Sequence, residues 1–380
     1  MAARRVLTAL ILSASAGLWG AAGVIPDAAA STPQPVSTAS MADPGVLLNG
    51  GHFYAFSTGT GLRESTASIA GGPWSAPANE MSSTGLPSWI DTSQGNWAPD
   101  MIETTAGTFV VYFAAALPGT SGNPTGNDSA PASGARCIGS AEFHPPPTWK
   151  SGDPIGPLTV DPKPVVCLKG YGASDDMTSD PGNRTLGEGV IDPSPAFVTI
   201  DGAQELFLLY KTQGQEGKST IRMARLADDD GTTVLGDSHQ LLNYVDAHGN
   251  YQDTIEGPSL IQNGNWFILF VAHGNYDTCG YGTEWFKSQH IWAWTSTAGT
   301  TLLDQSSTGL CGPGGADATA SEVSGQDRLF LHGWVKPGTT TPSGANNNNE
   351  SAAGQERVMY AAVLTFGSDG YTPSVSFLAP

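Results

Sequence analysis

Charged side chains are scarce in this chain of 380 residues, and basic ones are especially few. Asp, Glu, Lys and Arg make up 13% of the sequence, and 35 acidic residues against 16 basic ones give a formal net charge of −19. Nucleic-acid binding needs a basic surface for the phosphates. The charge balance therefore argues against a nucleic-acid partner and against an anionic membrane, and it suits a soluble protein with a neutral partner.

The sequence also lacks the pattern of long helices. We find no convincing amphipathic helical stretch after the N-terminal region, and 48 Gly and 27 Pro exclude a coiled coil. Short apolar and aromatic runs separated by turn residues take the place of helices. This pattern is typical of an all-β protein.

Cysteine is rare too, with only Cys137, Cys167, Cys279 and Cys311. None forms a Cys-x-x-Cys pair, so redox chemistry and a zinc site are not expected. Of the three possible pairings we favour Cys137–Cys167 and Cys279–Cys311. Each of these would lie within one structural repeat or join it to the next.

The N-terminal region differs from the rest of the chain. Arg4-Arg5 precede an apolar run that begins at Val6, and Ala28-Ala29-Ala30 offers a small-residue cleavage site. This is the pattern of a secretory signal peptide over residues 1–30, followed by a Ser/Thr/Pro-rich linker over 31–41. We therefore expect a secreted, extracellular protein, in which disulfides are favoured.

A unit of strand, turn and strand, preceded by an acidic residue, recurs along the remaining chain. In the copy TIEGPSLIQNGNWFILFVAHG, Glu256 precedes a short apolar run, Asn263-Gly264 supplies a hairpin turn, and an aromatic-rich run follows. The copies begin at Asp43, Asp100, Asp192, Glu256 and Asp317, at intervals of 57, 92, 64 and 61 residues. Repeats near this length predict blades of about four strands each, so we expect a five-bladed β-propeller over residues 42–380.

The propeller arrangement predicts where these acidic residues meet. The innermost strands line the central channel, so acidic residues at equivalent strand starts would converge at one mouth of it. Aspartate at a strand start is also a common turn residue, and we expect Asp100 and Asp317 to be structural. We further expect the terminal stretch Tyr371–Leu378 to close the ring by completing the first blade.

Several short motifs occur in an order that resembles a known family. They are Asp43-Pro44, WAPD at 97–100, IDPS at 191–194, EGPS at 256–259, HGNYDTCGYG at 273–282, GPGG at 312–315 and RVMY at 357–360. Together they resemble glycoside hydrolase family 43, the five-bladed propeller enzymes of the arabinanase and β-xylosidase group. Each motif is weak alone, but the ordered set covers nearly the whole chain after the N-terminal region.

The resemblance implies hydrolysis with inversion by three acidic residues. Asp43 corresponds to the general base, Glu256 to the general acid, and Asp192 to the residue that orients the acid and tunes its pKa. In an inverting enzyme the base and acid carboxyls lie about 6.5–9.5 Å apart, with room for a water. An ionised Asp192 and partial burial would raise the pKa of Glu256. The Asn-Asp-Pro-Asn motif of retaining furanosidases is absent around Asp43.

The expected partner is an oligo- or polysaccharide, bound by a monomer. We expect α-L-arabinofuranosyl links of plant cell-wall side chains to be cleaved, in an exo rather than an endo mode. β-Xylosidase and galactofuranosidase activities of the same family are alternatives. A catalytically inactive carbohydrate-binding propeller, or a purely structural one, would not need all three carboxylates.

Three aromatic residues are candidates for substrate binding. Trp97 lies either at the channel mouth or in the core, Tyr276 belongs to a polar and aromatic loop that suits sugar contacts, and Trp285 follows it. No cofactor and no metal ligands are expected. Many family members carry histidine where this chain has Ala42 and Gly315, so a structural calcium or sodium ion at the axis has no motif to support it.

Overall fold

Five four-stranded antiparallel sheets make up the fold, and each uses four consecutive strands. The computed structural model describes residues 32–82, 84–118, 135–167, 189–213, 219–243, 254–295, 299–321, 327–342 and 355–380. The signal peptide expected over residues 1–30 lies outside the described residues.

The strands of the first three sheets have the following bounds. The first sheet contains β1 (Gly45–Asn49), β2 (His52–Ser57), β3 (Arg63–Ala67) and β4 (Ala78–Asn79). The second contains β5 (Trp97–Glu103), β6 (Phe109–Ala116), β7 (Arg136–Phe143) and β8 (Thr159–Val160). The third contains β9 (Val190–Ile200), β10 (Ala203–Gln213), β11 (Ser219–Leu226) and β12 (His239–Asn243).

The last two sheets follow the same plan. The fourth contains β13 (Ile255–Asn263), β14 (Trp266–His273), β15 (Gly282–Ser288) and β16 (Thr300–Leu303). The fifth contains β17 (Cys311–Thr319), β18 (Asp327–Val335), β19 (Glu356–Phe366) and β20 (Pro373–Phe377). The only helix among the described residues, α1 (Gln305–Thr308), is four residues long, and no helix in this part of the chain could cross a membrane.

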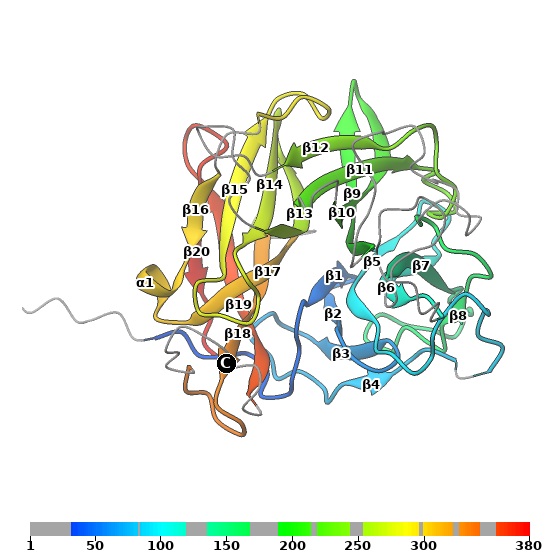
Figure 1. Cartoon of the computed structure of the whole chain (residues 1–380), viewed down its shortest axis with the longest axis horizontal. Coiled ribbons are helices and arrows are strands. Elements are labelled where there is room, and N and C mark those ends of the chain that lie inside the picture. The colour runs from blue at the N-terminus through cyan, green and yellow to red at the C-terminus, as the bar shows by residue number, and fades with distance from the viewer. Residues whose placement is uncertain are drawn as a thin grey trace, which may run out of the picture. The chain divides into compact units, whose positions relative to one another are not determined.

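The five sheets are the blades of a propeller. Figure 1 shows them following one another around a centre, with the first strand of each sheet innermost. Each inner strand packs against the next, from β1 to β5, β9, β13 and β17, and β17 packs against β1 again. The predicted five-bladed β-propeller is therefore confirmed.

Apolar packing between blades explains why the second strand of each blade is hydrophobic on both faces. In β10, Phe207 and Leu209 pack in a cluster shared with the fourth blade. Their neighbours Leu206, Leu208 and Tyr210 pack in a cluster shared with the second blade. A strand covered on both faces has no solvent side, so its sequence reads as a continuous apolar run rather than an alternation.

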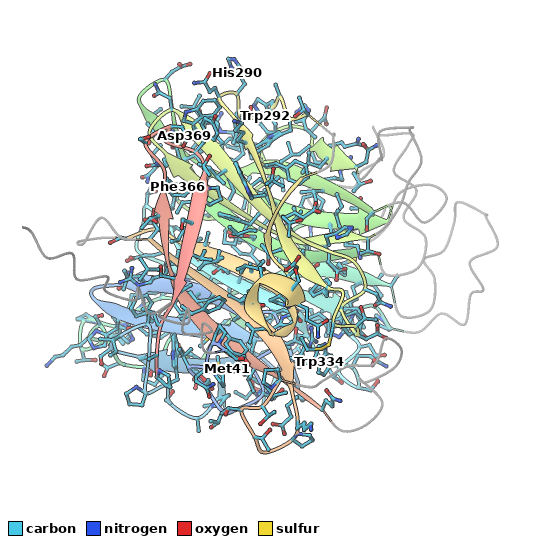
Figure 2. The ribbon with its side chains drawn as sticks, turned by 90° about the vertical axis from the view of Figure 1, so that its left-hand side faces the viewer. Met41, His290, Trp292, Trp334, Phe366 and Asp369 are labelled. Carbon is cyan, nitrogen blue, oxygen red and sulfur yellow. A yellow bond between two sulfur atoms is a disulfide. The ribbon has the colours of Figure 1, made fainter. Side chains whose placement is uncertain are left out.

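The ring closes differently from our prediction. The terminal strand β20 pairs with β19 in the fifth blade and not with the first blade. The residues just before the first blade join the fifth instead: the backbone N–H of Val36 donates to the carbonyl of Met359 at 2.9 Å, and that of Met41 to Arg357 at 2.8 Å. Met41 is labelled in Figure 2. Part of the stretch expected to be a linker therefore fastens the first blade to the last.

Both predicted disulfides are present. Cys137 of β7 pairs with Cys167, and Cys279 pairs with Cys311, the first residue of β17. The second bond joins the connection between β14 and β15 to the start of the fifth blade's inner strand. It therefore links two neighbouring blades at the end of the ring where their inner strands begin.

Candidate active site

A cavity of about 260 Å³ lies where the inner strands begin, and all five acidic residues singled out in the sequence line it. They are Asp43, Asp100, Asp192, Glu256 and Asp317. The predicted convergence of these residues is therefore observed. Their depths differ, however, because the inner strands are irregular at this point.

β-Bulges in the inner strands give the acidic residues different positions relative to the partner strands. Four inner strands take an extra residue against their partner strands, in the steps 97 to 100, 191 to 194, 256 to 259 and 314 to 317, and β17 takes another in the step 311 to 314. In each of these four steps, the second residue has a positive φ. For example, φ is 56° at Asp192 and 53° at Gly257. Asp43, with φ 50°, holds the same place two residues before β1.

The bulge alignment corrects our assumption that the five acidic residues are equivalent. Asp43 and Asp192 occupy the positive-φ position, Glu256 precedes it by one residue, and Asp100 and Asp317 follow it by two. Left-handed backbone in a non-glycine residue costs on the order of 1–3 kcal/mol and concentrates at functional sites. The strained backbone at Asp43 and Asp192 therefore makes these two aspartates candidates for a functional role.

Two side-chain donors hold Asp43 as a carboxylate. Oδ1 lies 2.9 Å from Nη1 of Arg357 in β19, and Oδ2 accepts the hydroxyl proton of Thr58 at 2.7 Å. Burial raises the pKa of Asp43, but the charge of Arg357, the electrostatic effect of the neighbouring His332 ring and the Thr58 hydrogen bond together outweigh burial and leave this pKa lowered. A carboxylate that stays ionised and faces a cavity can accept a proton from water.

His332 of β18 holds the backbone of Asp43 in place. Its Nδ1 accepts the backbone N–H of Asp43 at 3.1 Å, and the ring is fully buried. Burial and the nearby Arg357 lower the pKa of His332 to about 3, although Asp43 opposes them. Gly315 makes room for this ring, since a Cβ at Gly315 would lie 2.7 Å from Nδ1. The imidazole is thus neutral at physiological pH.

Asp192 of β9 and Glu256 of β13 form a second group in the lining of the same cavity. Glu256 Oε2 lies 2.8 Å from Nζ of the buried Lys211, and Oε1 accepts the hydroxyl proton of Tyr281 at 2.9 Å. Asp192 Oδ2 accepts the backbone N–H of Gly257 at 2.9 Å. Burial and the charge of Glu256 raise the pKa of Asp192 to about 8, against the opposing charge of Lys211.

This arrangement differs from the expected ionised Asp192 beside a protonated Glu256. Both oxygens of Glu256 accept hydrogen bonds, which suits a carboxylate, while Asp192 is the group whose pKa is raised. The physical reason is Lys211, whose ammonium group contacts Glu256 directly. The sequence does not show that Lys211 faces the site.

Asp100 and Asp317 lie deeper and tie the blades together. Asp317 accepts the backbone N–H of Val46 at 2.7 Å and the hydroxyl of Ser259 at 2.9 Å, which joins the fifth blade to the first and the fourth. Burial raises the pKa of both aspartates, that of Asp317 to about 6, and the nearby Asp317 further raises that of Asp100. The contacts of Asp317 join neighbouring blades, and the structural role expected for Asp100 and Asp317 stays a prediction.

Of the three aromatic candidates, Trp97 and Tyr276 line the cavity and Trp285 does not. Trp97 is 37% exposed, with the Arg136 guanidinium 3.5 Å from its ring centroid, and Tyr276 is 46% exposed. Trp285 in β15 packs toward Tyr371 within the cluster between the fourth and fifth blades. The side chain of Trp285 is therefore engaged away from this cavity.

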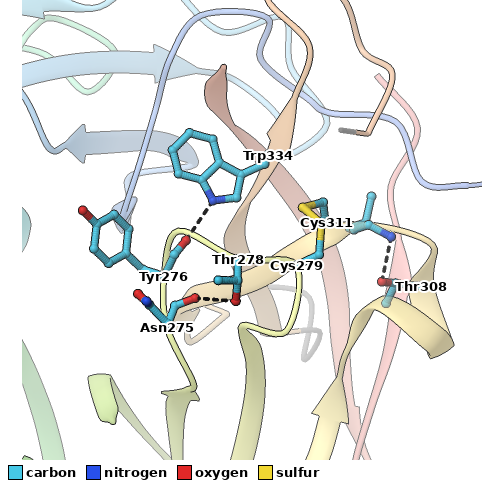
Figure 3. Close-up of a disulfide and its surroundings, with 8 residues drawn as sticks. Asn275, Tyr276, Thr278, Cys279, Thr308, Cys311 and Trp334 are labelled. Atoms are coloured by element: carbon cyan, nitrogen blue, oxygen red, sulfur yellow. Dashed lines mark hydrogen bonds between the residues drawn. A yellow bond between two sulfur atoms is a disulfide. The ribbon is translucent and has the colours of Figure 1, made fainter. Parts of the chain in front are cut away.

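The loop that carries Tyr276 and Tyr281 is anchored on both sides. Figure 3 shows the disulfide between Cys279 and Cys311 beside it, and the indole N–H of Trp334 donating to the carbonyl of Tyr276 at 2.8 Å. Tyr281 stacks on His332, with ring centroids 5.8 Å apart. These contacts fix the position of the hydroxyl that reaches Glu256.

Within the described ranges, no group of three or more His, Cys, Asp or Glu side chains is arranged to hold an ion. One nitrogen of His332 already accepts the Asp43 backbone N–H. The structural calcium or sodium ion considered from the resemblance therefore has no set of side-chain ligands in this part of the chain.

Sequence reasoning missed four residues that complete the site: Lys211, Tyr281, His332 and Arg357. Two of them carried a signal, because Lys211 and His332 each interrupt an apolar run, LFLLYKT and LFLHGW. A charged or polar side chain in a strand that is buried on both faces must have a partner at the blade end. Tyr281 and Arg357 lie within two quoted motifs but had no role assigned.

Comparison with known proteins identifies the fold. The sequence matches no protein-family model, and no curated protein matches it. The structure is similar to that of a thermostable family-43 glycoside hydrolase, with a TM-score of 0.64 and 16% identity over 92% of this chain and 96% of that one. The fold expected from the motifs is thus confirmed: a five-bladed propeller shared with family-43 glycoside hydrolases.

Two further structures show the range of proteins with this fold. An α-L-arabinanase from Cellvibrio cellulosa in complex with arabinohexaose has a TM-score of 0.59 and 17% identity, over 89% of this chain and 96% of its own. An endo-1,4-β-xylanase from Bacteroides thetaiotaomicron has a TM-score of 0.56 and 17% identity, over 92% of this chain and 98% of its own.

Proposed function

We propose that this protein is a family-43-type glycoside hydrolase that cleaves glycosidic bonds with inversion. The convergence of Asp43, Asp192 and Glu256 on one cavity is the observation that carries the proposal. The same cavity is lined by two partly exposed aromatic rings, Trp97 and Tyr276, which suit stacking against a sugar. Family-43 hydrolases with the same fold support the reaction class.

In the proposed mechanism, Asp43 is the general base. Its carboxylate, kept ionised by Arg357 and Thr58, takes a proton from a water molecule as the water oxygen attacks the anomeric carbon. Glu256, in its protonated form, gives a proton to the glycosidic oxygen as the bond from that oxygen to the anomeric carbon breaks. Asp192 lies near enough to the acid for the charge of Glu256 to raise its pKa.

We propose α-L-arabinofuranosyl ends of plant cell-wall polysaccharides as the substrate, cleaved in an exo mode. The aromatic rings of Trp97 and Tyr276 in the lining of the cavity suit contact with a terminal sugar.

The test is a hydrolysis screen of the protein lacking residues 1–30. It uses nitrophenyl α-L-arabinofuranoside, β-D-xyloside and β-D-galactofuranoside beside arabinan, arabinoxylan and arabinogalactan, with NMR of the first-formed anomer. Release of arabinose with inverted configuration is the expected result. Release of xylose or galactofuranose would favour the alternative substrates, and retained configuration would overturn the role of Asp43. Binding of a polysaccharide without hydrolysis would favour a carbohydrate-binding propeller.

Two variants test the residue roles. Asp43→Asn and Glu256→Gln should each lower turnover by about 10²–10⁴-fold, the usual loss for a missing general base or acid, with unchanged circular dichroism. Glu256→Gln should lose less on a nitrophenyl glycoside, because that leaving group needs little protonation. Equal losses on activated and natural substrates would contradict the role of Glu256 as acid.

We also propose that the protein is exported. Two disulfides support this, since such bonds persist in oxidising compartments. N-terminal sequencing of the protein from the culture medium of a producing cell should find a start close to residue 31. Retention of the whole chain within the cell would contradict export.

A further inference from the structure

The starting observation is that the hydrogen bonds of Glu256 and Asp192 are unequal. Glu256 accepts from two buried donors, Lys211 Nζ at 2.8 Å on Oε2 and the Tyr281 hydroxyl at 2.9 Å on Oε1. Lys211 is 1% exposed and the Glu256 side chain 13%. Asp192 accepts one hydrogen bond among the described residues, from the N–H of Gly257 to Oδ2. An oxygen of Asp192 therefore remains to carry a proton.

We infer that Lys211 and Tyr281 are positioning residues that keep Glu256 ionised in the resting site and leave its proton on Asp192, which returns it to Glu256 for catalysis. This inference rests on the proposed glycosidase function. In the transfer, the O–H bond of Asp192 breaks and an O–H bond of Glu256 forms, so Asp192 becomes the carboxylate. Glu256 then protonates the glycosidic oxygen and returns to its pair with Lys211, and Asp192 regains a proton from solvent.

The charged and titratable groups that face the pair act unequally on its two members. Lys211 and Tyr281 contact Glu256 directly. Burial, the charge of Glu256 and the more distant Asp43 raise the pKa of Asp192, and they outweigh the charge of Lys211 and the Gly257 hydrogen bond, which lower it. Arg357 lies on the Asp43 side and compensates that carboxylate instead. Lys211 thus contacts the carboxylate of Glu256 and Arg357 that of Asp43. We infer that Asp192, the third acidic residue of the group, is neutral.

The surrounding packing shows that both donors are built into the site. Lys211 pairs with Ile191 across the ladder between β10 and β9, next to the bulge that projects Asp192. Burying an ammonium group costs several kcal/mol unless a partner compensates it. Tyr281 fits because Gly314 has no side chain, since a Cβ there would lie 2.3 Å from the ring.

The experiment follows the carboxyl carbons of Asp and Glu by ¹³C NMR as pH is varied. Signals are assigned with Asp192→Asn and Glu256→Gln. In the unaltered protein, the Glu256 signal at pH 6 should be that of a carboxylate, and the Asp192 signal should titrate near the value of about 8. In Lys211→Met, the Glu256 signal at pH 6 should move toward the protonated position, and the last proton should leave the pair at a higher pH than in the unaltered protein.

Further variants separate positioning from structure. Lys211→Arg keeps the charge and should restore the carboxylate signal, and Tyr281→Phe should shift it in the same direction as Lys211→Met but less. Lys287→Met removes a lysine that lies over the Tyr371 ring, at 3.2 Å from its centroid, and should change neither signal. The kcat/KM of Lys211→Met should fall by up to about 10²-fold, the loss for a misplaced catalytic group, with its alkaline limb moved upward.

The outcomes distinguish this inference from the proposed function. A protonated Glu256 at pH 6 in the unaltered protein would overturn it, as would a Glu256 signal unchanged by both Lys211→Met and Tyr281→Phe. These readings need no substrate. If the signals behave as expected but no glycoside is hydrolysed, the proton distribution stands and the proposed function fails. If Lys211→Met does not fold, Tyr281→Phe and Lys211→Arg still decide.

Discussion

Arg357→Met should raise the pH at which the enzyme becomes active. Arg357 Nη1 lies 2.9 Å from Asp43 Oδ1, and its charge is the largest of the effects that lower the pKa of Asp43 against burial. An opposite charge at this range shifts a carboxyl pKa by about 1–3 units, and each unit is about 1.4 kcal/mol. Without Arg357, burial dominates and the pKa of Asp43 rises above its ordinary value.

The sign of the effect follows from the proposed role of Asp43 as the general base. Asp43 accepts a proton only when ionised, so activity is lost as pH falls through its pKa. The acid limb of kcat/KM, which reports the free enzyme, should therefore move to higher pH by about 1–3 units. The assay is a pH profile of kcat/KM on the best substrate from the screen, and the limb is measured separately from the plateau, because Arg357 also lines the cavity.

Two matched variants complete this test. Arg357→Lys retains the charge and should return most of the shift, while Thr58→Val removes the hydroxyl that donates to Oδ2 at 2.7 Å and should give a smaller shift in the same direction. An acid limb that stays within half a unit, roughly, of the original in Arg357→Met would refute the reasoning, since even the low end of the expected range is larger.

Two further predictions concern stability. The double variants Cys279→Ser/Cys311→Ser and Cys137→Ser/Cys167→Ser open bonds of similar sequence separation, 32 and 30 residues, so urea unfolding should show a similar loss for each, about 3–4 kcal/mol. Only the first should also lower kcat in folded protein, because its loop carries Tyr281, and equal activity of the two would contradict that role. Burial raises the pKa of Glu64 to about 7 from 4.5, so its contribution is complete below pH 4.5 and is lost as pH rises to 7. Glu64→Gln should remove about 3 kcal/mol of that decline in the free energy of unfolding, and identical pH profiles would show that Glu64 is not responsible.

The fold and the meeting of the carboxylates were predictable because both follow from repetition. Five copies of one unit can bury their apolar faces only against each other, and Asn263-Gly264 indicates the hairpin within a copy. The cysteine pairing followed from proximity in sequence. These features depend on local pattern, which a sequence displays directly.

The register of the acidic residues was not predictable in the same way. It depends on a bulge of one residue in four inner strands, and one residue changes which side chain faces the cavity. A signal is visible afterwards, because Asp43, Ala98, Asp192 and Gly257 all precede proline and all have positive φ. The fifth blade has Gly315-Ala316 at this position, so the proline that marks the other four copies is missing there.

The basic groups and the ring closure escaped prediction because they depend on contacts between distant segments. Lys211 meets Glu256 from the preceding blade, and Arg357 meets Asp43 across 314 positions of the chain. The closure by residues 36–41 replaces the expected one by Tyr371–Leu378. Sequence spacing does not distinguish these two closures, since either end of the chain can supply the closing segment.

The closure has a consequence for biosynthesis. Met41 donates its N–H to Arg357, and two residues later Asp43 contacts the same arginine through its side chain. The charge that keeps Asp43 ionised is thus carried by β19, which a ribosome makes almost last. A nascent chain, or one shortened before β19, has Asp43 but lacks both this counter-charge and the backbone contact of Met41. The proposed base therefore acquires its lowered pKa, and the ring its closure, at the same late moment of synthesis.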